Sequence, residues 1–555
     1  MSPPDARPAG AAILLLFVPF VLFCHWRIYA GAWGALDIGL WDESVYLAYG
    51  VELNLRNAGA FGADALLYRA WYRLLGLFYA DRIDVYMANW VAMPLAVAAL
   101  MGLWLRRATP TRSLVVLCAP VFLFLISVRT FELWPRVTLF LAAVALATLI
   151  LVRRARRPAG AFVVVAAGAF AASYVRGEML LATVVALAVA AALAWRLPPR
   201  QRTQVALGVA SVVAGAVALM ALFAHPALDN GLRQDIAMAQ HLSIAWVRLT
   251  GSTLDGFRDY ETIIPQIFGD ERRWWRWPLV APGFVAAHVA DNALRLPAAA
   301  AAFLVHPPLV VPGGRAAQIA EAAAVGLALL ALFGRLAWRD GRGFVRRHAV
   351  ALGAMAVLAL PQLAAALVLY PHGHYLLLPF VLALLVVGLA LADLRVGEGW
   401  PAARTVFLAV VAVLLTPRAF PGFYEARHAR PDGAAARPTI ETIRFVRDLR
   451  FARPVRLLTH DYGYAAYLPG VAVMETTLQQ KGDRLFALYL TGIRADVIVV
   501  DGSVGRQARY RDDTSWKNFI ANPEAAGWRR LAVPGAGREL LIRATLRCRH
   551  PACAQ

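Results

Sequence analysis

Two adjacent acids, Asp42 and Glu43, open a long polar stretch that follows the first apolar run of the chain. The residues after them predict an amphipathic helix that continues to about Leu55. A partly desolvated carboxylate at a membrane edge can accept a proton from an attacking hydroxyl, so the pair is a candidate general base. Acids also stabilise the first turn of a helix by facing its exposed N–H groups, and this alternative stays open.

An arginine and a glutamate occupy a second polar turn, at residues 174–178, where almost no loop separates two apolar runs. The guanidinium group of Arg176 matches phosphate oxygens bidentately, so this residue is a candidate phosphate ligand. The alternative is an interfacial arginine that extends to the headgroup level and pairs with Glu178.

Two further turns carry ionisable side chains. His372 and His374 flank Gly373 in one turn, and Glu132 and Arg136 lie in the other. Ionisable residues at the ends of membrane spans are costly to keep there, so each is a functional candidate. The histidines suit hydrogen bonding or phosphate contact, or are ordinary turn residues. No third ligand is indicated, so we predict no metal site.

The elements that must position these side chains are membrane helices. Apolar residues make up 60% of the chain and charged residues 16%, against about 45–50% and about 25% in soluble proteins. Uncharged runs long enough to cross ~30 Å of hydrocarbon must be helical. We therefore predict an α-helical polytopic membrane protein with about 11 transmembrane helices. The expected spans are residues 11–30, 86–105, 113–127, 134–152, 159–173, 179–195, 203–224, 316–334, 349–370, 374–392 and 404–418.

Arginines indicate the orientation, because cytoplasmic loops of membrane proteins are enriched in basic residues. Among the short loops, an N-terminus in the cytoplasm places most arginines inside. The short outer loops then hold only Arg129, Arg136 and Arg176. The predicted cytoplasmic arginines are Arg106, Arg107, Arg112, Arg153, Arg154, Arg156, Arg157, Arg196, Arg200, Arg202, Arg335, Arg339, Arg342, Arg346, Arg347, Arg395 and Arg404.

One apolar segment, Ala298–Val311, decides on which side of the membrane the later loops lie, because one more crossing would reverse them all. It is short, and Pro297, Pro307 and Pro308 interrupt it. A crossing here would move the arginine-rich loop after residue 334 to the outside, against the positive-inside rule. We therefore expect a re-entrant or surface helix on the outer face.

The predicted topology gives two domains in the cell (inner) membrane. Residues 1–420 form the transmembrane domain, with external loops at residues 31–85 and 225–315. Residues 421–555 form a soluble α/β domain on the periplasmic or extracellular side. The net charge of +21 lies in short loops and not along a groove. We therefore interpret these cations as orientation signals, and nucleic acid is excluded. Membrane lipids are expected partners of the chain.

The C-terminal domain contains short elements that the sequence locates. Strands are expected at Val455–Thr459 and Val497–Asp501, with a short helix at Tyr462–Leu468 between them. Cys548 and Cys553 either form a disulfide outside the cytoplasm or belong to a free tail.

Several short motifs match those of one known group. Asp42, Glu43 and Tyr46 form Asp-Glu-x-x-Tyr directly after the first helix. The stretch Leu66–Gly76, which includes Arg69, is similar to a second juxtamembrane helix of that group. Residues 174–181 and 374–379 are similar to its basic turn before the sixth helix and to the opening of a late helix. With the external C-terminal domain, the chain resembles the GT-C superfamily, in particular the protein O-mannosyltransferase and lipid A aminoarabinose transferase group.

The chain departs from this group in three places. Ala63–Ala65 stands where Pro-Pro-Leu is common, Arg136 stands near an expected acid, and His374 replaces an arginine. These departures affect the expected phosphate contacts and substrate more than the expected fold.

The resemblance implies an inverting glycosyl transfer on the non-cytoplasmic face. Asp42 would act as base on an acceptor hydroxyl, and Arg176, His374 and Arg69 would ease the charge of the leaving phosphate. The donor would be a polyprenyl-phosphate-linked sugar, and the acceptor a lipid, glycan or protein. No cofactor is expected, and no glycine fingerprint for a dinucleotide is present.

Other functions compete with this one. A transporter or flippase places polar groups near the bilayer midplane, often in repeated halves, whereas here they gather at one face. An inactive scaffold that handles lipid-linked glycans stays open. A polymerase or ligase of such glycans usually relies on external arginines and lacks the early Asp-Glu loop.

Overall fold

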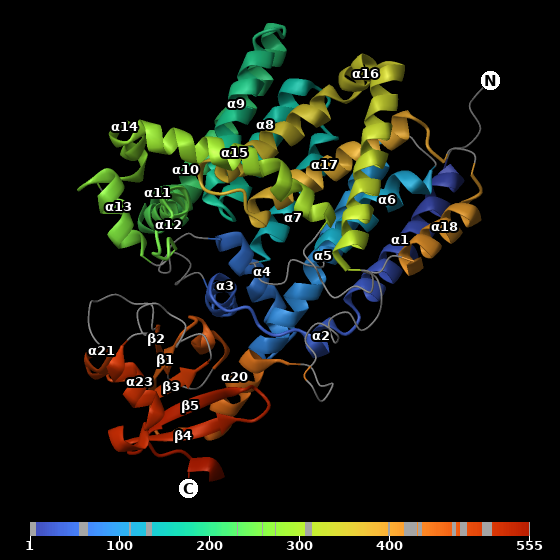
Figure 1. The fold of residues 1–555 in the computed structure, drawn as a ribbon. Coiled ribbons are helices and arrows are strands. Elements are labelled where there is room, and N and C mark those ends of the chain that lie inside the picture. Colours follow the sequence, from blue (N-terminus) through green and yellow to red (C-terminus); the bar gives the residue numbers. More distant parts are fainter. Residues whose placement is uncertain are drawn as a thin grey trace, which may run out of the picture.

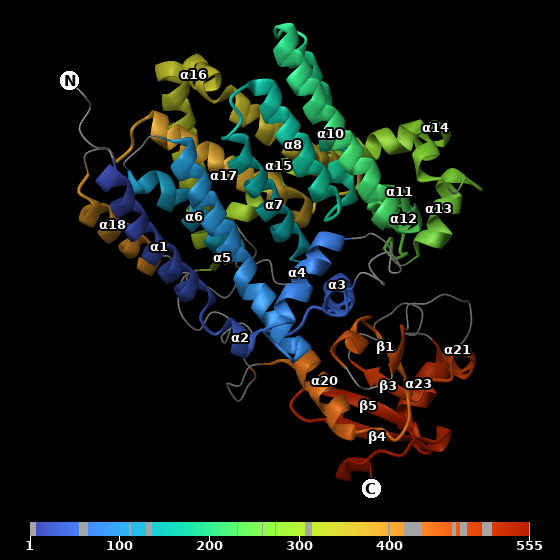
Figure 2. The same cartoon turned by 180° about the vertical axis from the view of Figure 1, so that it is seen from behind.

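A computed structural model describes residues 7–54, 65–109, 113–128, 136–229, 231–257, 259–271, 273–305, 314–397, 400–415, 430, 436–468, 473–477, 486–501 and 513–553. A large helical unit lies above a small α/β unit, and two short helices lie between them (Figure 1, Figure 2). The main helices of the first unit are α1 (Arg7–Tyr29), α5 (Arg82–Ala108), α6 (Leu114–Val128), α7 (Val137–Val152), α8 (Pro158–Ser173), α9 (Leu180–Ala194), α10 (Pro199–Phe223), α12 (Gly231–Thr250), α15 (Pro282–Val305), α16 (Gly314–Val368), α17 (Gly373–Asp393) and α18 (Ala402–Leu415).

Apolar helices of membrane-crossing length confirm a helical membrane protein. Within the described residues, 6 stretches are long and apolar enough to cross a bilayer. Shorter apolar helices, α6, α7 and α8, pack among them. The predicted number of about 11 crossings is not fixed by these lengths and stays a prediction. The 6 stretches are Leu15–Ala35, Arg82–Ala108, Gly177–Ala194, Pro199–Phe223, Gly326–Val368 and Gly373–Asp393.

The region around α15 and α16 differs from the prediction in two respects. Pro297 was expected to interrupt the chain, but it lies inside α15, which packs against α16 and α17. The predicted segment Ala298–Val311 is therefore the last part of a longer helix as far as Val305, and the remainder lies outside the described residues. The loop expected after residue 334 is helical, and α16 kinks there at Asp340 (φ −166°, ψ 54°).

The two helices between the units are α3 (Asp42–Val51) and α4 (Leu66–Leu75). The first begins at the acid pair, as predicted. The two helices approach closely at Gly50, where a Cβ atom would lie 2.5 Å from Tyr72 Cβ and 2.8 Å from the Arg69 carbonyl oxygen. Only glycine fits at this crossing, which brings the inner face of α4 against the start of α3.

The α/β unit contains one mixed sheet with the strand order β2-β1-β3-β5-β4. β1 lies parallel to β2 and β3, and β5 is antiparallel to β3 and β4. The strand predicted at Val455–Thr459 is confirmed, and the next predicted strand ends at Val500. The predicted short helix is a 3-10 turn. The elements are α20 (Pro438–Leu449), β1 (Val455–Thr459), η4 (Tyr464–Tyr467), β2 (Val473–Thr477), α21 (Phe486–Ile493), β3 (Val497–Val500), α23 (Thr514–Ala521), β4 (Trp528–Val533) and β5 (Arg538–Arg543).

A disulfide joins Cys548 and Cys553. The sequence left this pairing open against a free tail. Disulfides persist in oxidising compartments. The position of this unit outside the cytoplasm stays a prediction.

Polar contacts dock the α/β unit on the helical unit. The Asp37 carboxylate accepts hydrogen bonds from the backbone N–H groups of Thr439 (2.8 Å) and Ile440 (3.0 Å), at the start of α20. Arg447, near the end of α20, donates two hydrogen bonds to Asp81 at 2.9 and 3.0 Å. Both ends of α20 are thus fixed to residues that flank the first external stretch.

We expect Asp37→Ala to loosen this docking, because the start of α20 loses its cap, at a cost of about 1–2 kcal/mol. Limited proteolysis of the purified chain should release the α/β unit faster than in wild type. The matched control is Asp513→Ala, which removes the cap of α23 inside the α/β unit. Equal rates of release in the two variants would contradict a specific docking role for Asp37.

Candidate functional site

Four segments meet at the end of the helical unit that faces the α/β unit: α3, α4, the turn before α9 and the turn before α17. The Leu67 backbone N–H donates to the Tyr174 carbonyl (3.4 Å), which joins α4 to the turn before α9. Arg176 lies over the Tyr375 ring, 5.2 Å from its centroid, and interacts electrostatically with Tyr46 of α3. Residues that the sequence predicted in separate loops are therefore brought together.

Glu43 is the centre of a buried hydrogen-bond network. Its side chain is 4% exposed. Oε1 accepts hydrogen bonds from the Tyr68 and Tyr72 hydroxyls and from Asn89 Nδ2 (3.2 Å). Oε2 accepts one from the backbone N–H of Arg136 (2.7 Å). Burial raises the pKa of Glu43 to about 7, against the lowering effect of the two tyrosines and Arg136.

Asp42 occupies the more open position of the acid pair, since it is only half-buried. The preceding residue, Trp41, has a left-handed φ of 72° and a ψ of −131°, which strains a residue with a side chain. Two contacts with the α/β unit hold it there. The Trp41 N–H donates to the Tyr462 carbonyl (2.8 Å), and its indole donates to Asp461 Oδ1 (3.2 Å). The α/β unit therefore fixes the backbone that leads into Asp42.

Arg136 contributes a buried cation beside this network. Its side chain is 2% exposed, and its guanidinium carbon lies 3.8 Å from the centre of the Trp90 ring. Nε, Nη1 and Nη2 have no hydrogen-bond partner among the residues that the structure describes. Only the backbone N–H of this residue is used by Glu43. The guanidinium donors are thus buried and have no acceptor among the described residues.

Arg176, by contrast, is already paired. Its Nε and Nη2 both donate to Glu178 Oε1 at 2.8 Å, and Gln362 Nε2 donates to the same oxygen at 3.0 Å. The side chains of Arg176 and Glu178 are 20% and 30% exposed. This geometry agrees with the structural alternative left open by the sequence, and it holds α16 against the turn before α9.

Three imidazoles lie together at the turn before α17. His372 Nδ1 and His374 Nδ1 are 3.1 Å apart, so one donates and the other accepts. His241 of α12 stacks on Tyr370, and burial, with His372 and His288 nearby, lowers its pKa to about 4. Burial also lowers the pKa of His372. Among the described residues no group of three or more side chains is arranged to hold a metal ion.

Two further predicted residues have packing roles in this region. Tyr46 is 3% exposed, with its ring 5.7 Å from that of Tyr68. Arg69 is 3% exposed and lies 5.2 Å from the centre of the Tyr49 ring. Glu132, which was predicted beside Arg136, lies outside the described residues.

The sequence prediction missed several members of the network. Tyr68 and Tyr72 are four residues apart on one face of α4, and this spacing is a usable signal. Asn89 is a polar residue within an apolar span, which alone marks it as a candidate. It accepts a hydrogen bond from Trp71 (2.8 Å) and donates to the Tyr68 (2.7 Å) and Tyr72 (2.9 Å) hydroxyls. His241 carried no local signal.

Comparison with known proteins finds no matching family model, no matching curated protein and no matching solved structure. The chemistry of the site therefore has to be argued from its own geometry. It combines a half-buried carboxylate at a strained helix start, a buried acid held by hydroxyl donors, and a buried guanidinium. Within the described ranges, the donors of this guanidinium have no hydrogen-bond partner.

Proposed function

We propose that the protein is an inverting glycosyltransferase. It takes a sugar from a polyprenyl-phosphate donor and transfers it to an acceptor hydroxyl at the non-cytoplasmic face of the membrane. The observation that carries this proposal is the buried Arg136 guanidinium next to an acid pair at the end of the helical unit. Its donors have no hydrogen-bond partner among the described residues. The sequence resemblance supplies the donor class.

A phosphate is the anion that suits Arg136 best. A buried charge without a partner is costly, and an anionic ligand removes that cost by supplying both charge and acceptors. Guanidinium groups bind phosphate oxygens with two parallel hydrogen bonds. Arg176 is less suited, because Glu178 already neutralises it. We therefore assign the donor phosphate to Arg136 and a supporting role to Arg176.

The proposed reaction is a single displacement. The acceptor oxygen bonds to the anomeric carbon while the bond from that carbon to the phosphate oxygen breaks, which inverts the configuration. Asp42 takes the proton of the attacking hydroxyl. The leaving polyprenyl phosphate keeps the electron pair of the broken bond, and Arg136 stabilises its added negative charge. Both oxygens of Glu43 already accept hydrogen bonds. We therefore give this residue a positioning role, at the start of α3 and the Arg136 backbone, and not the catalytic role that the sequence predicted.

The expected orientation has the N-terminus in the cytoplasm and the α/β unit outside. Two observations support it. Arg153, Arg156, Arg157 and Arg347, from separate predicted cytoplasmic loops, line a common cavity. The disulfide lies in the unit docked at the opposite end of α5.

Arg136→Gln tests the proposal, because it removes the guanidinium and keeps the backbone N–H that Glu43 requires. Binding of polyprenyl phosphate, the proposed product, should weaken roughly tenfold to a hundredfold. The melting temperature should change little, because the guanidinium makes no hydrogen bond to the described residues. Transfer is measured with purified chain, a panel of polyprenyl-phosphate donors carrying labelled sugars, and cell-envelope extract as acceptor.

The matched control is Arg73→Gln, at an exposed arginine of α4 that bonds only the Val51 carbonyl in the described structure. This variant should bind polyprenyl phosphate as wild type does. Equal affinity of wild type and Arg136→Gln for polyprenyl phosphate would contradict the proposed phosphate site. A wild-type chain that binds polyprenyl phosphate but transfers no sugar from any donor would reject the transferase and favour a flippase or scaffold.

A further inference from the structure

A second site lies at the other end of the helical unit, in the turn between α7 and α8. Arg153 Nη2 donates to the Arg107 carbonyl (3.5 Å), at the C-terminal end of α5. Asp81, which caps the N-terminal end of α5, pairs with Arg447 of the α/β unit. A helix of 27 residues is about 40 Å long. The α7–α8 turn is therefore separated by a membrane-sized distance from the site proposed above.

The first feature of this end is a basic cavity of about 200 Å³ between α5, α7, α8 and α16. Arg153, Arg156 and Arg157 of the turn line it together with Arg347. Arg347 is neutralised by two carboxylates, at 2.7 and 2.6 Å. The three turn arginines have no carboxylate partner within the described part of the chain. The cavity thus keeps a positive charge.

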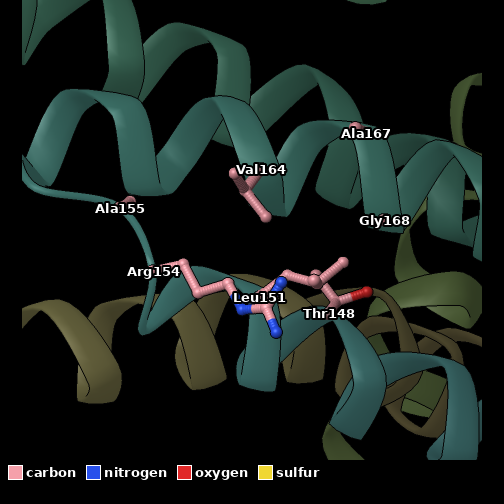
Figure 3. A pocket seen from close by; sticks show the side chains of 7 residues that line it. All are labelled: Thr148, Leu151, Arg154, Ala155, Val164, Ala167 and Gly168. Carbon is pink, nitrogen blue, oxygen red and sulfur yellow. The ribbon is translucent and has the colours of Figure 1, made fainter.

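The second feature is an apolar cavity of about 600 Å³ between α7 and α8. Figure 3 shows Val164 pointing into it from α8, with Leu151 of α7 opposite and Arg154 reaching along it from the turn. The helices come together beyond it, where a Cβ atom on Gly168 would lie 2.1 Å from Thr148 Oγ1. Ala155 lines both cavities, so the apolar groove and the basic cavity adjoin.

We infer that these adjoining cavities form a binding site for an anionic phospholipid of the bilayer. The lipid phosphate is held by the turn arginines, and an acyl chain lies in the groove between α7 and α8. Two observations point to a lipid and not to free phosphate. The basic cavity continues into an apolar groove, and the two apolar helices that line this groove pack among helices of membrane-crossing length. Basic pockets between membrane helices bind anionic headgroups in this way. The inference is independent of the proposed transfer reaction.

The headgroup contact is tested with the full-length chain in nonionic micelles, titrated with phosphatidylglycerol. We expect Arg156→Gln combined with Arg157→Gln to weaken binding roughly tenfold or more. The matched control combines Arg196→Gln, after α9, with Arg200→Gln, in the first turn of α10. Both arginines are exposed and do not line the cavity. Equal losses in the two double variants would overturn the site, because they would show only general attraction to a basic surface.

The groove is tested separately with Ala167→Trp, which places a large side chain in the apolar cavity. Ala192→Trp, at an exposed position of α9, is its control. We expect only Ala167→Trp to weaken phosphatidylglycerol binding, and phosphatidylcholine to bind wild type poorly. Competition by glycerol phosphate as strong as that by the whole lipid would overturn the inference in favour of a free-phosphate site. An unchanged affinity of Ala167→Trp would likewise overturn it.

Discussion

Replacement of Asp42 by asparagine is expected to lower sugar transfer by about two to four orders of magnitude, the usual contribution of a general base. Asparagine keeps the shape of the side chain and its hydrogen-bonding capacity but cannot take the proton of the acceptor hydroxyl. The half-buried position and the retained polarity predict little change in stability. The Asp42→Asn variant should therefore lose sugar transfer but still bind polyprenyl phosphate as wild type does.

The control for this variant is Asp461→Asn. Asp461 lies on the same face and accepts the Trp41 indole hydrogen bond, and an asparagine oxygen can still accept it. Its transfer rate should stay within a few-fold of wild type. Transfer by Asp42→Asn at a rate near that of wild type would show that Asp42 is not the base, and the proposed mechanism would have to be abandoned.

Glu43→Ala is expected to cause the largest loss of stability. It leaves the Tyr68 and Tyr72 hydroxyls, the Asn89 amide and the Arg136 N–H without their buried acceptor. Breaking such a buried network costs roughly 3–5 kcal/mol. The free energy of unfolding, or the melting temperature in micelles, measures the loss. A loss below about 1 kcal/mol would contradict the network, since that is typical of an ordinary surface change.

Glu43→Gln is the matched variant, because it keeps one oxygen acceptor and removes the titration. The pKa of Glu43 is raised from 4.5 to about 7 in the folded protein. The folded state therefore holds this proton between those pH values, while the unfolded state releases it, so stability falls as pH rises through that window. Wild type should lose more stability than Glu43→Gln between pH 4.5 and 7. Parallel pH profiles would contradict the assignment.

The sequence alone determined the class of the protein and the positions of most helices. Apolar runs such as those of α5 and α17 carry their own signal, because a helix in hydrocarbon satisfies its backbone internally. The start of α3 at Asp42 and the bounds of β1 could likewise be predicted, because both follow from short stretches of the chain. The break expected at Pro297 was wrong, because a proline removes one hydrogen bond but α15 continues through it.

The tertiary structure alone decided which side chains of the candidate site are buried and which contact one another. The sequence does not distinguish the two adjacent acids. Glu43 is buried among hydroxyls from α4 and bonds a backbone N–H that lies 93 residues away, whereas Asp42 is only half-buried. The docking of Asp37 on α20 also depends on partners far along the chain. Hydropathy and residue spacing indicate the secondary structure of a residue's own segment. Its hydrogen-bond partners depend instead on how different segments pack together. For this reason the sequence could predict that these polar groups lie at one face. Only the fold distinguished Asp42, the candidate base, from the buried Glu43.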